Sequence, residues 1–149
     1  MEYTILNEAL QKYKQMITKN KLSYKFMKFF MSKENPKISI ETYFYRICQY
    51  SECPDQVVAA GQIIAERTFP NGISEIMIHR VMLISIMLAF KMYIDHFRWK
   101  LDRWANIGGI HSKEIYSLEI NMLTAIDWRL LITEEEFLKK YRSLRVHKI

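Results

Sequence analysis

Residues 81–90 read Val-Met-Leu-Ile-Ser-Ile-Met-Leu-Ala-Phe, a run that contains one hydroxyl and no charge. Arg80 and Lys91 bound it on either side. A membrane-spanning helix needs about 20 apolar residues, so this run is too short to cross a bilayer. A helix that is apolar all round must instead be surrounded by other helices. The run therefore predicts the central helix of a bundle, extending from a cap at Ser74 to about Tyr93.

Four other segments show the 3.6-residue spacing of amphipathic helices, and none shows the alternation of a strand. Thr133 and Glu136 form a capping box at the start of the last segment, and Ser112 is placed to cap the one before it. Between Tyr93 and Ser112 we expect a loop that ends in Gly108-Gly109. The prediction is an all-α fold of five helices around a central third helix. The four outer helices cover roughly residues 38–50, 54–69, 112–126 and 133–143.

A polar stretch around Pro36 marks a boundary, because the residue before a proline disfavours helix. We expect an N-terminal helical arm over residues 1–37, the helical box over residues 38–143 and a tail over residues 144–149. The arm holds eight lysines against three acidic residues, whereas the rest of the chain holds 14 basic and 13 acidic residues. A nearly neutral body argues against a broad nucleic-acid surface.

Between Leu22 and Phe30 the arm interleaves aromatic residues with lysines. Such a mixture could suit an acidic membrane surface or a nucleic acid. Aromatic residues at this mixed spacing more often cover a core or face a partner protein. We therefore expect these side chains to pack on the body or on another protein.

No motif indicates catalysis, because the chain lacks both a glycine-rich phosphate loop and a nucleophile with a positioned base. Cys48 and Cys53 have no standard zinc-ligand spacing with His79, His96 or His111, so we expect buried free thiols and no metal. Cofactors and small-molecule substrates are not expected either. No signal-peptide pattern opens the sequence, which favours the cytoplasm or the nucleus.

Charged residues within the apolar helices are more informative. Near a core, a charge is tolerated when it is paired or directed at a partner. Any one of these charged side chains could also reach solvent along its own aliphatic stem. Several of them together along the chain are more informative than any single one. The set consists of Arg46, Glu66, Arg67, Arg80, Lys91 and Glu119.

These charges and their neighbours, taken in order over roughly residues 38–143, resemble the cyclin box. The likeness is narrower for the P-type or U-type cyclins related to the fungal phosphate-pathway cyclins. The residues that carry it are Ile38-Ser39-Ile40 with Tyr43, Arg46 and Ile47, Glu66-Arg67, His79-Arg80, Ala89-Phe90-Lys91 with Asp95, Ala105 to Ile110, Leu118-Glu119 and Phe137. The run Phe97-Arg98-Trp99-Lys100 departs most from the family pattern.

The resemblance implies a non-catalytic regulatory subunit that binds and activates a cyclin-dependent protein kinase. It assigns Lys91 and Glu119 to the kinase interface, where they contact the kinase's movable helix. Arg46 and Glu66 are expected to form a structural ion pair between the first two box helices. The alternative is a cyclin-fold module of the transcription-factor or pocket-protein kind, which contacts nucleic acid or a peptide. An enzyme is the third and least supported interpretation.

Overall fold

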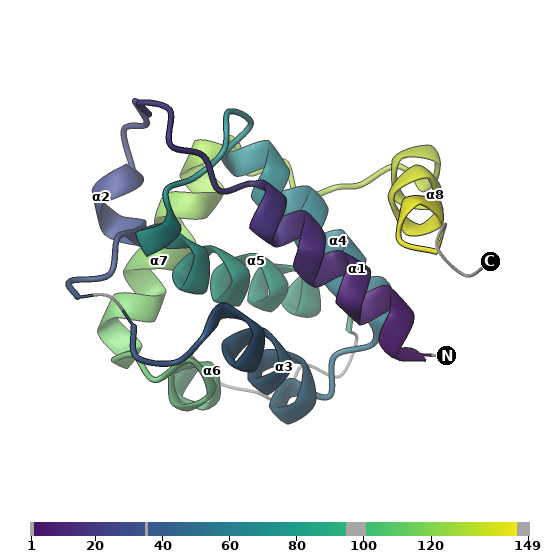
Figure 1. Cartoon of the computed structure of the whole chain (residues 1–149), viewed down its shortest axis with the longest axis horizontal. Helices are drawn as coiled ribbons and strands as arrows, with labels where there is room; N and C mark the ends of the chain where they lie inside the picture. The colour runs from purple at the N-terminus through teal and green to yellow at the C-terminus, as the bar shows by residue number, and fades with distance from the viewer. Residues whose placement is uncertain (1, 35, 95–100, 146–149) are drawn as a thin grey trace.

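The computed structural model describes residues 2–34, 36–94 and 101–145. Over these ranges the chain forms eight α-helices and a short 3-10 helix, η1, with no strand beyond one isolated bridge (Figure 1). Their bounds are α1 Glu2–Gln15, α2 Met27–Phe30, α3 Ile40–Ser51, α4 Asp55–Thr68, η1 Glu75–Met77, α5 Ile78–Tyr93, α6 Leu101–Gly108, α7 Ser112–Ala125 and α8 Glu134–Ser143.

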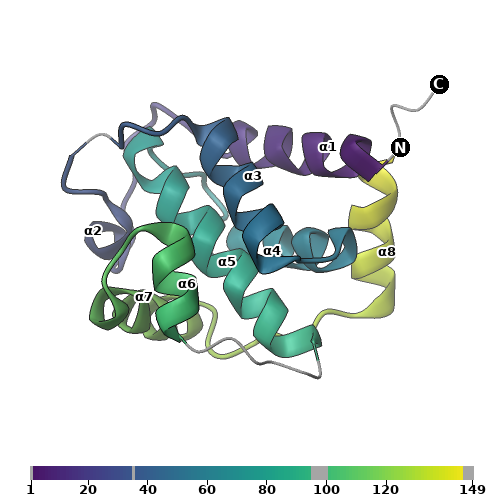
Figure 2. The ribbon, with the colours of Figure 1, turned by 90° about the horizontal axis from the view of Figure 1, so that it is seen from below.

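The apolar run forms the greater part of α5, and every residue from 81 to 90 is buried. Helices α1, α3, α4, α6 and α7 all contact α5, which therefore lies at the centre of the bundle (Figures 1 and 2). The segment Glu75–Tyr93 is long and apolar enough to span a membrane by composition alone, but 72% of its most apolar window is buried inside the fold. The predicted all-α fold with a central apolar helix is confirmed.

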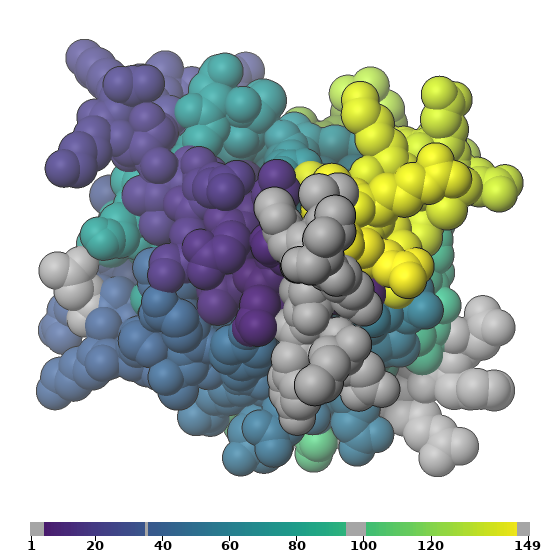
Figure 3. Space-filling view, turned by 45° about the vertical axis from the view of Figure 1, so that its right-hand side comes forward, coloured from purple at the N-terminus to yellow at the C-terminus, as the bar shows by residue number. Residues whose placement is uncertain are grey.

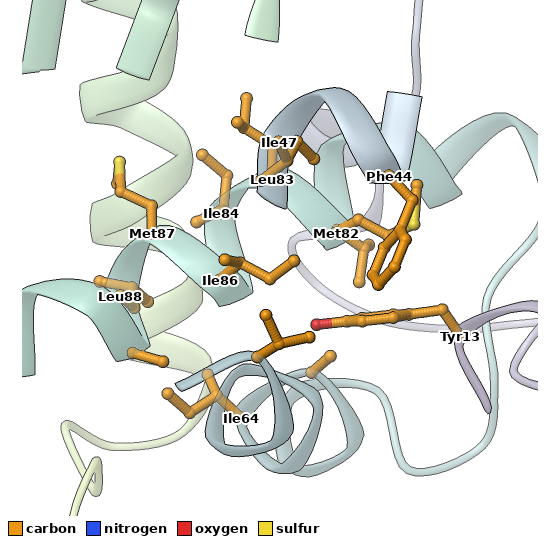
Figure 4. Packing of buried hydrophobic residues seen from close by; sticks show 14 of the residues in the cluster. Tyr13, Phe44, Ile47, Ile64, Met82, Leu83, Ile84, Ile86, Met87 and Leu88 are labelled. Atoms are coloured by element: carbon orange, nitrogen blue, oxygen red, sulfur yellow. The ribbon is translucent and has the colours of Figure 1, made fainter. Parts of the chain in front are cut away.

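The N-terminal arm packs into the same core as the box. Ala9 and Tyr13 of α1 are fully buried, and the Tyr13 hydroxyl lies 2.8 Å from the Ser85 hydroxyl of α5. Figure 4 shows the Tyr13 ring beneath Phe44, with its oxygen directed into the cluster. Burial raises the pKa of Tyr13, so the phenol stays protonated. On α4, the Gln62 amide donates to the Ala9 carbonyl at 3.1 Å. Residue 37 therefore does not separate two cores.

The aromatic stretch of the arm closes over one end of this core. The rings of Tyr24 and Phe30 meet the Phe69 ring edge-on, with centroids 5.0 and 5.3 Å away. The Tyr24 hydroxyl also donates to the Gly72 carbonyl at 3.0 Å. Phe29 remains 38% exposed. Most of the stretch thus packs on the body, while its lysines stay at the surface.

Helix α6 lies where the sequence predicts a loop, and this is a correction. Trp104 of α6 is fully buried and packs edge-on against Phe90, with ring centroids 5.5 Å apart. Gly108 ends the helix against α5, where a Cβ atom would lie 2.2 Å from a Leu83 methyl carbon. Gly109 follows with a φ of 68°, the left-handed conformation that suits glycine. The two glycines therefore terminate helix α6, whereas the sequence predicted that they terminate a loop. Residues 95–100, including Asp95, His96 and the run 97–100, lie outside the described residues.

The predicted helix caps are partly correct. Ser74 precedes η1, but its side chain makes no capping hydrogen bond. Helix α7 is capped by His111, whose side chain accepts from the Lys113 amide, while Ser112 donates to Asp102. Thr133 does cap α8: its hydroxyl accepts from the Glu136 amide at 3.1 Å.

Thr133→Ala is expected to lower the free energy of unfolding by about 1 kcal/mol, because it removes this N-cap acceptor. Urea denaturation of the purified protein measures the change. Thr133→Ser keeps the hydroxyl and should stay close to the parent value. Ser23→Ala, at an exposed loop position, is the matched control. An equal loss in the alanine and serine variants of Thr133 would contradict the capping role.

Candidate functional site

The structure brings Lys91 and Glu119 together. Lys91 lies in the last turn of α5 and Glu119 in the middle of α7, and the Lys91 Nζ atom is 2.5 Å from a Glu119 carboxylate oxygen. The Lys91 side chain is 33% exposed and that of Glu119 only 7%. Glu119 is buried because it shares the inward face of α7 with Ile115, Leu118 and Met122. The pair therefore joins a buried carboxylate to an ammonium at the surface.

Apolar side chains lie exposed directly after Lys91. Met92 is 44% and Tyr93 39% exposed, although both belong to the same helix as the buried run. Tyr93 also lines a cavity of about 500 Å³ between α4, the end of α5 and the start of α8, together with Val57 and Phe137. Sequence reasoning missed this apolar surface. The sequence did contain a signal for it, because the apolar residues of the buried helix continue beyond Lys91 with Met92 and Tyr93.

The turn after α7 presents two more exposed apolar residues, Trp128 at 60% and Leu131 at 73%. Asp127 and Trp128 both have left-handed backbones, with φ values of 56° and 59°. For residues other than glycine, this conformation costs about 1–2 kcal/mol per residue. The Trp128 amide donates to the Leu123 carbonyl at 2.8 Å, which fixes the turn. A defined backbone thus presents the Trp128 ring to solvent.

Arg46 and Glu66 do not form the predicted ion pair, and the structure corrects that assignment. Arg46 donates from Nε to the Ile107 carbonyl at 2.8 Å and from Nη2 to the Asn106 carbonyl at 3.4 Å. A cation suits these carbonyls because they lie at the C-terminal end of α6. Glu66 instead pairs with Lys140 of α8 at 2.7 Å. The prediction failed because it treated α6 as a loop.

Helix α8 is attached to α4 by two parallel ion pairs. Glu66 binds Lys140, and the neighbouring Arg67 binds Glu136 at 2.6 Å. No residue of α8 is fully buried. Leu144, just beyond its end, is fully buried. Figure 3 shows the α8 region in yellow at the upper right of the molecular surface.

The two cysteines are buried and free. Burial raises the pKa of Cys48 to about 12 and that of Cys53 further still, so both thiols are neutral at physiological pH. Over residues 2–34, 36–94 and 101–145, no group of three or more histidine, cysteine or acidic side chains is placed to hold a metal ion. The described part of the chain thus offers neither a thiolate nucleophile nor a metal centre.

Comparison with known proteins identifies the fold. The chain matches the cyclin family over residues 6–130, a match that begins inside the arm. It is 29% identical to rice (Oryza sativa subsp. japonica) Cyclin-P3-1 over 135 residues, which cover 89% of this chain and 56% of that protein. It is 26% identical to Arabidopsis thaliana Cyclin-U2-1 over 112 residues, 72% of this chain and 50% of that protein.

A fungal relative shows the same likeness. The PHO85 cyclin-like protein psl1 of Schizosaccharomyces pombe is 31% identical over 120 residues, 77% of this chain and 49% of that protein. The chain therefore belongs to the cyclin family. Within it, the chain is similar to P-type and U-type cyclins and to this PHO85 cyclin-like protein, as its sequence predicts. It spans about half the length of the curated relatives that it matches.

Proposed function

We propose that this cyclin is a non-catalytic regulatory subunit that binds and activates a cyclin-dependent protein kinase in the cytoplasm or nucleus. The observation that carries the proposal is the Lys91–Glu119 pair at the edge of an exposed apolar surface. Exposed aromatic residues and methionine are typical of the centre of a protein interface. The chain's similarity to P-type, U-type and PHO85 cyclin-like proteins supports a kinase as the partner.

The proposed mechanism uses the end of α5 and the middle of α7 as a rigid support. A protein kinase is active only when the Glu of its movable helix pairs with the catalytic-site Lys. A partner that binds the kinase better with this helix in place shifts the equilibrium toward the active form. A shift of about 10⁴ needs roughly 5.5 kcal/mol of differential contact, which an interface of standard size can provide.

Lys91 and Glu119 have separate parts in this mechanism. The lysine supplies N–H donors to backbone carbonyls of the kinase, and the glutamate holds the ammonium in position beforehand. Met92 and Tyr93, which follow Lys91 directly, then supply exposed apolar contact beside the charged pair. Because Glu119 is buried, its main effect is on the position of the lysine.

The test uses Lys91→Met with Glu119→Met, because replacing both members of a buried pair by apolar residues of similar size preserves stability. Affinity purification and mass spectrometry from the source cell should recover a cyclin-dependent kinase with the parent protein. We expect the double variant to lower kinase binding by at least about tenfold, through loss of charge-assisted hydrogen bonds. Kinase activity at a fixed cyclin concentration should fall with it.

The matched control is Glu66→Met with Lys140→Met, which removes the ion pair between α4 and α8. This control should bind and activate the kinase as the parent does. Equal binding and activation by the Lys91/Glu119 double variant would show that the interface lies elsewhere. Recovery of no kinase at all would contradict the proposed function itself.

A further inference from the structure

A second cavity lies at the opposite end of α5 from Lys91. It has a volume of about 390 Å³ and is formed by the loop before α3, by α3, by the first turn of α5 and by the turn between α6 and α7. Three of its lining residues, Lys37, Arg46 and Arg80, are cationic, and no described residue that lines it is acidic. We call it the basic pocket. Arg80 and Lys91 are about 17 Å apart along the helix axis, at 1.5 Å per residue.

Two of the three cations have no carboxylate partner among the described residues. Arg80 forms an ion pair with Glu114 at 2.5 Å, so its charge is compensated. Within the part of the chain that the structure describes, Arg46 donates to the Ile107 and Asn106 carbonyls, which are neutral acceptors. Lys37 is exposed and has no ion-pair partner within the described ranges. The pocket therefore carries an excess of about two positive charges, although the C-terminal dipole of α6 partly screens Arg46.

The walls of the pocket are fixed before any ligand arrives. The Tyr43 hydroxyl donates to the Gly108 carbonyl at 2.7 Å, and burial raises the pKa of Tyr43, so this donor keeps its proton. His79 lies 2.9 Å from the Ile38 carbonyl through Nε2, and its ring meets the Tyr43 ring edge-on. Arg46 is likewise held by its two carbonyl contacts. A cation held in this way, such as Arg46, binds an anion without a large ordering cost.

His79 provides an independent indication of a ligand. His79 is one of the residues that line the pocket, and it is only 7% exposed. Because Nε2 faces the Ile38 carbonyl, it carries a proton, and in the neutral ring Nδ1 is then an acceptor. Nδ1 is buried and has no hydrogen-bond partner among the residues that the structure describes. A ligand that completes this site has an N–H or O–H donor close to its anionic group. Peptides that carry a phosphate group have both.

We infer that the basic pocket binds the phosphate group of a phosphorylated serine or threonine in a peptide segment. Arg46 and Lys37 face the phosphate oxygens, and arginine suits them because its guanidinium can donate two parallel hydrogen bonds. The apolar walls at Pro36, Ile38 and Ile110 accommodate a neighbouring side chain. Free phosphate shares the anionic chemistry but not these peptide contacts. This site is separate from the proposed kinase surface.

Fluorescence anisotropy tests the inference with the full chain. The probe is a labelled degenerate peptide mixture with a fixed central phosphoserine or phosphothreonine, and the reference is the same mixture without phosphate. We expect phosphorylation to tighten binding by at least about tenfold, and Lys37→Gln to abolish most of that difference. Lys37 is exposed and makes no hydrogen bond or ion pair within the described residues, so its replacement is not expected to disturb folding. Lys139→Gln on α8, exposed and distant from the pocket, is the matched control and should bind as the parent does.

Competition with inorganic phosphate and comparison of the variants distinguish a phosphopeptide ligand from free phosphate. Inorganic phosphate should displace the phosphopeptide only at concentrations well above the peptide's Kd. Free phosphate that binds as tightly as the phosphopeptide would overturn the peptide as ligand. Equal binding of the two peptide mixtures, or equal losses in the Lys37 and Lys139 variants, would overturn the site. Arg46→Gln, checked for folding by thermal denaturation, should reproduce the effect of Lys37→Gln.

Discussion

Lys91→Met is expected to lower the free energy of unfolding by about 3 kcal/mol. It removes the cation that lies 2.5 Å from the Glu119 carboxylate and leaves a charge at a position only 7% exposed. Breaking a buried ion pair by removing one member typically costs about 3–5 kcal/mol. The low end applies here because the Lys91 side chain is itself a third exposed, so water can approach the gap. Urea denaturation followed by circular dichroism measures the loss.

Replacing Glu119 instead of Lys91 should lower the free energy of unfolding far less. Glu119→Met places an apolar side chain at a buried position, and Lys91 can turn its ammonium to solvent. We expect a cost below about 1 kcal/mol, and a similar value for the double variant. The asymmetry distinguishes a buried carboxylate from an ordinary surface ion pair. Equal costs for the two single variants would show that burial of Glu119 does not determine the energetics.

Gly61→Val is expected to cost about 3 kcal/mol, the upper end of the range for overpacking a core. Gly61 lies where α4 crosses α5, and a Cβ atom there would be 3.0 Å from the Ile86 Cα atom and 3.1 Å from the Ser85 carbonyl oxygen. Both neighbours are backbone atoms, which cannot move aside as a flexible side chain can. The two helices must therefore separate, which also loosens Ile86 and the Tyr13–Ser85 contact.

A graded series checks this explanation. Gly61→Ala should cost less than the valine variant, because alanine adds a single carbon and improves helix propensity. Gln56→Val, at an exposed position of the same helix, should change the free energy of unfolding by less than about 0.5 kcal/mol. Thermal denaturation measures all three variants. A valine at residue 61 that unfolds like the parent would contradict the tight crossing of α4 and α5.

The central helix was predictable because a fully buried helix has an uninterrupted run of uncharged, mostly apolar residues in its sequence. Ten consecutive residues without a charge can form a helix only where other helices surround them. The cap at Thr133 was predictable for a similar reason, since it depends on a local hydrogen bond within four residues. Features that arise within one element, or from its complete burial, can thus be derived from the chain alone.

Features that depend on contacts between distant elements were harder to predict. Helix α6 is only eight residues long, and Trp104 is buried because Phe90 and the rest of α5 lie beside it. Without α6, the carbonyls that bind Arg46 could not be foreseen, and Arg46 was assigned to Glu66 instead. The same holds for Ser112, whose hydroxyl turns to Asp102 of α6.

Only the charged residues of the candidate site could be predicted from the sequence. Resemblance to cyclins singled out Lys91 and Glu119, and the structure places them in contact. Resemblance did not indicate that Glu119 is buried, because a charge on an apolar helix can equally reach solvent. Nor did it identify Met92 or Trp128, since exposure of an apolar residue depends on where neighbouring helices end. A single sequence does not show where neighbouring helices end in space.

The Tyr13–Ser85 contact also bears on how the chain is made. The two residues are 72 positions apart, so at about 5–20 residues per second the ribosome needs roughly 4–15 seconds to deliver the serine after the tyrosine. A 14-residue helix is marginal by itself in water. During synthesis, helix α1 therefore lacks its packing partner on α5 for several seconds, and this part of the core can form only after residue 85 has been added to the chain.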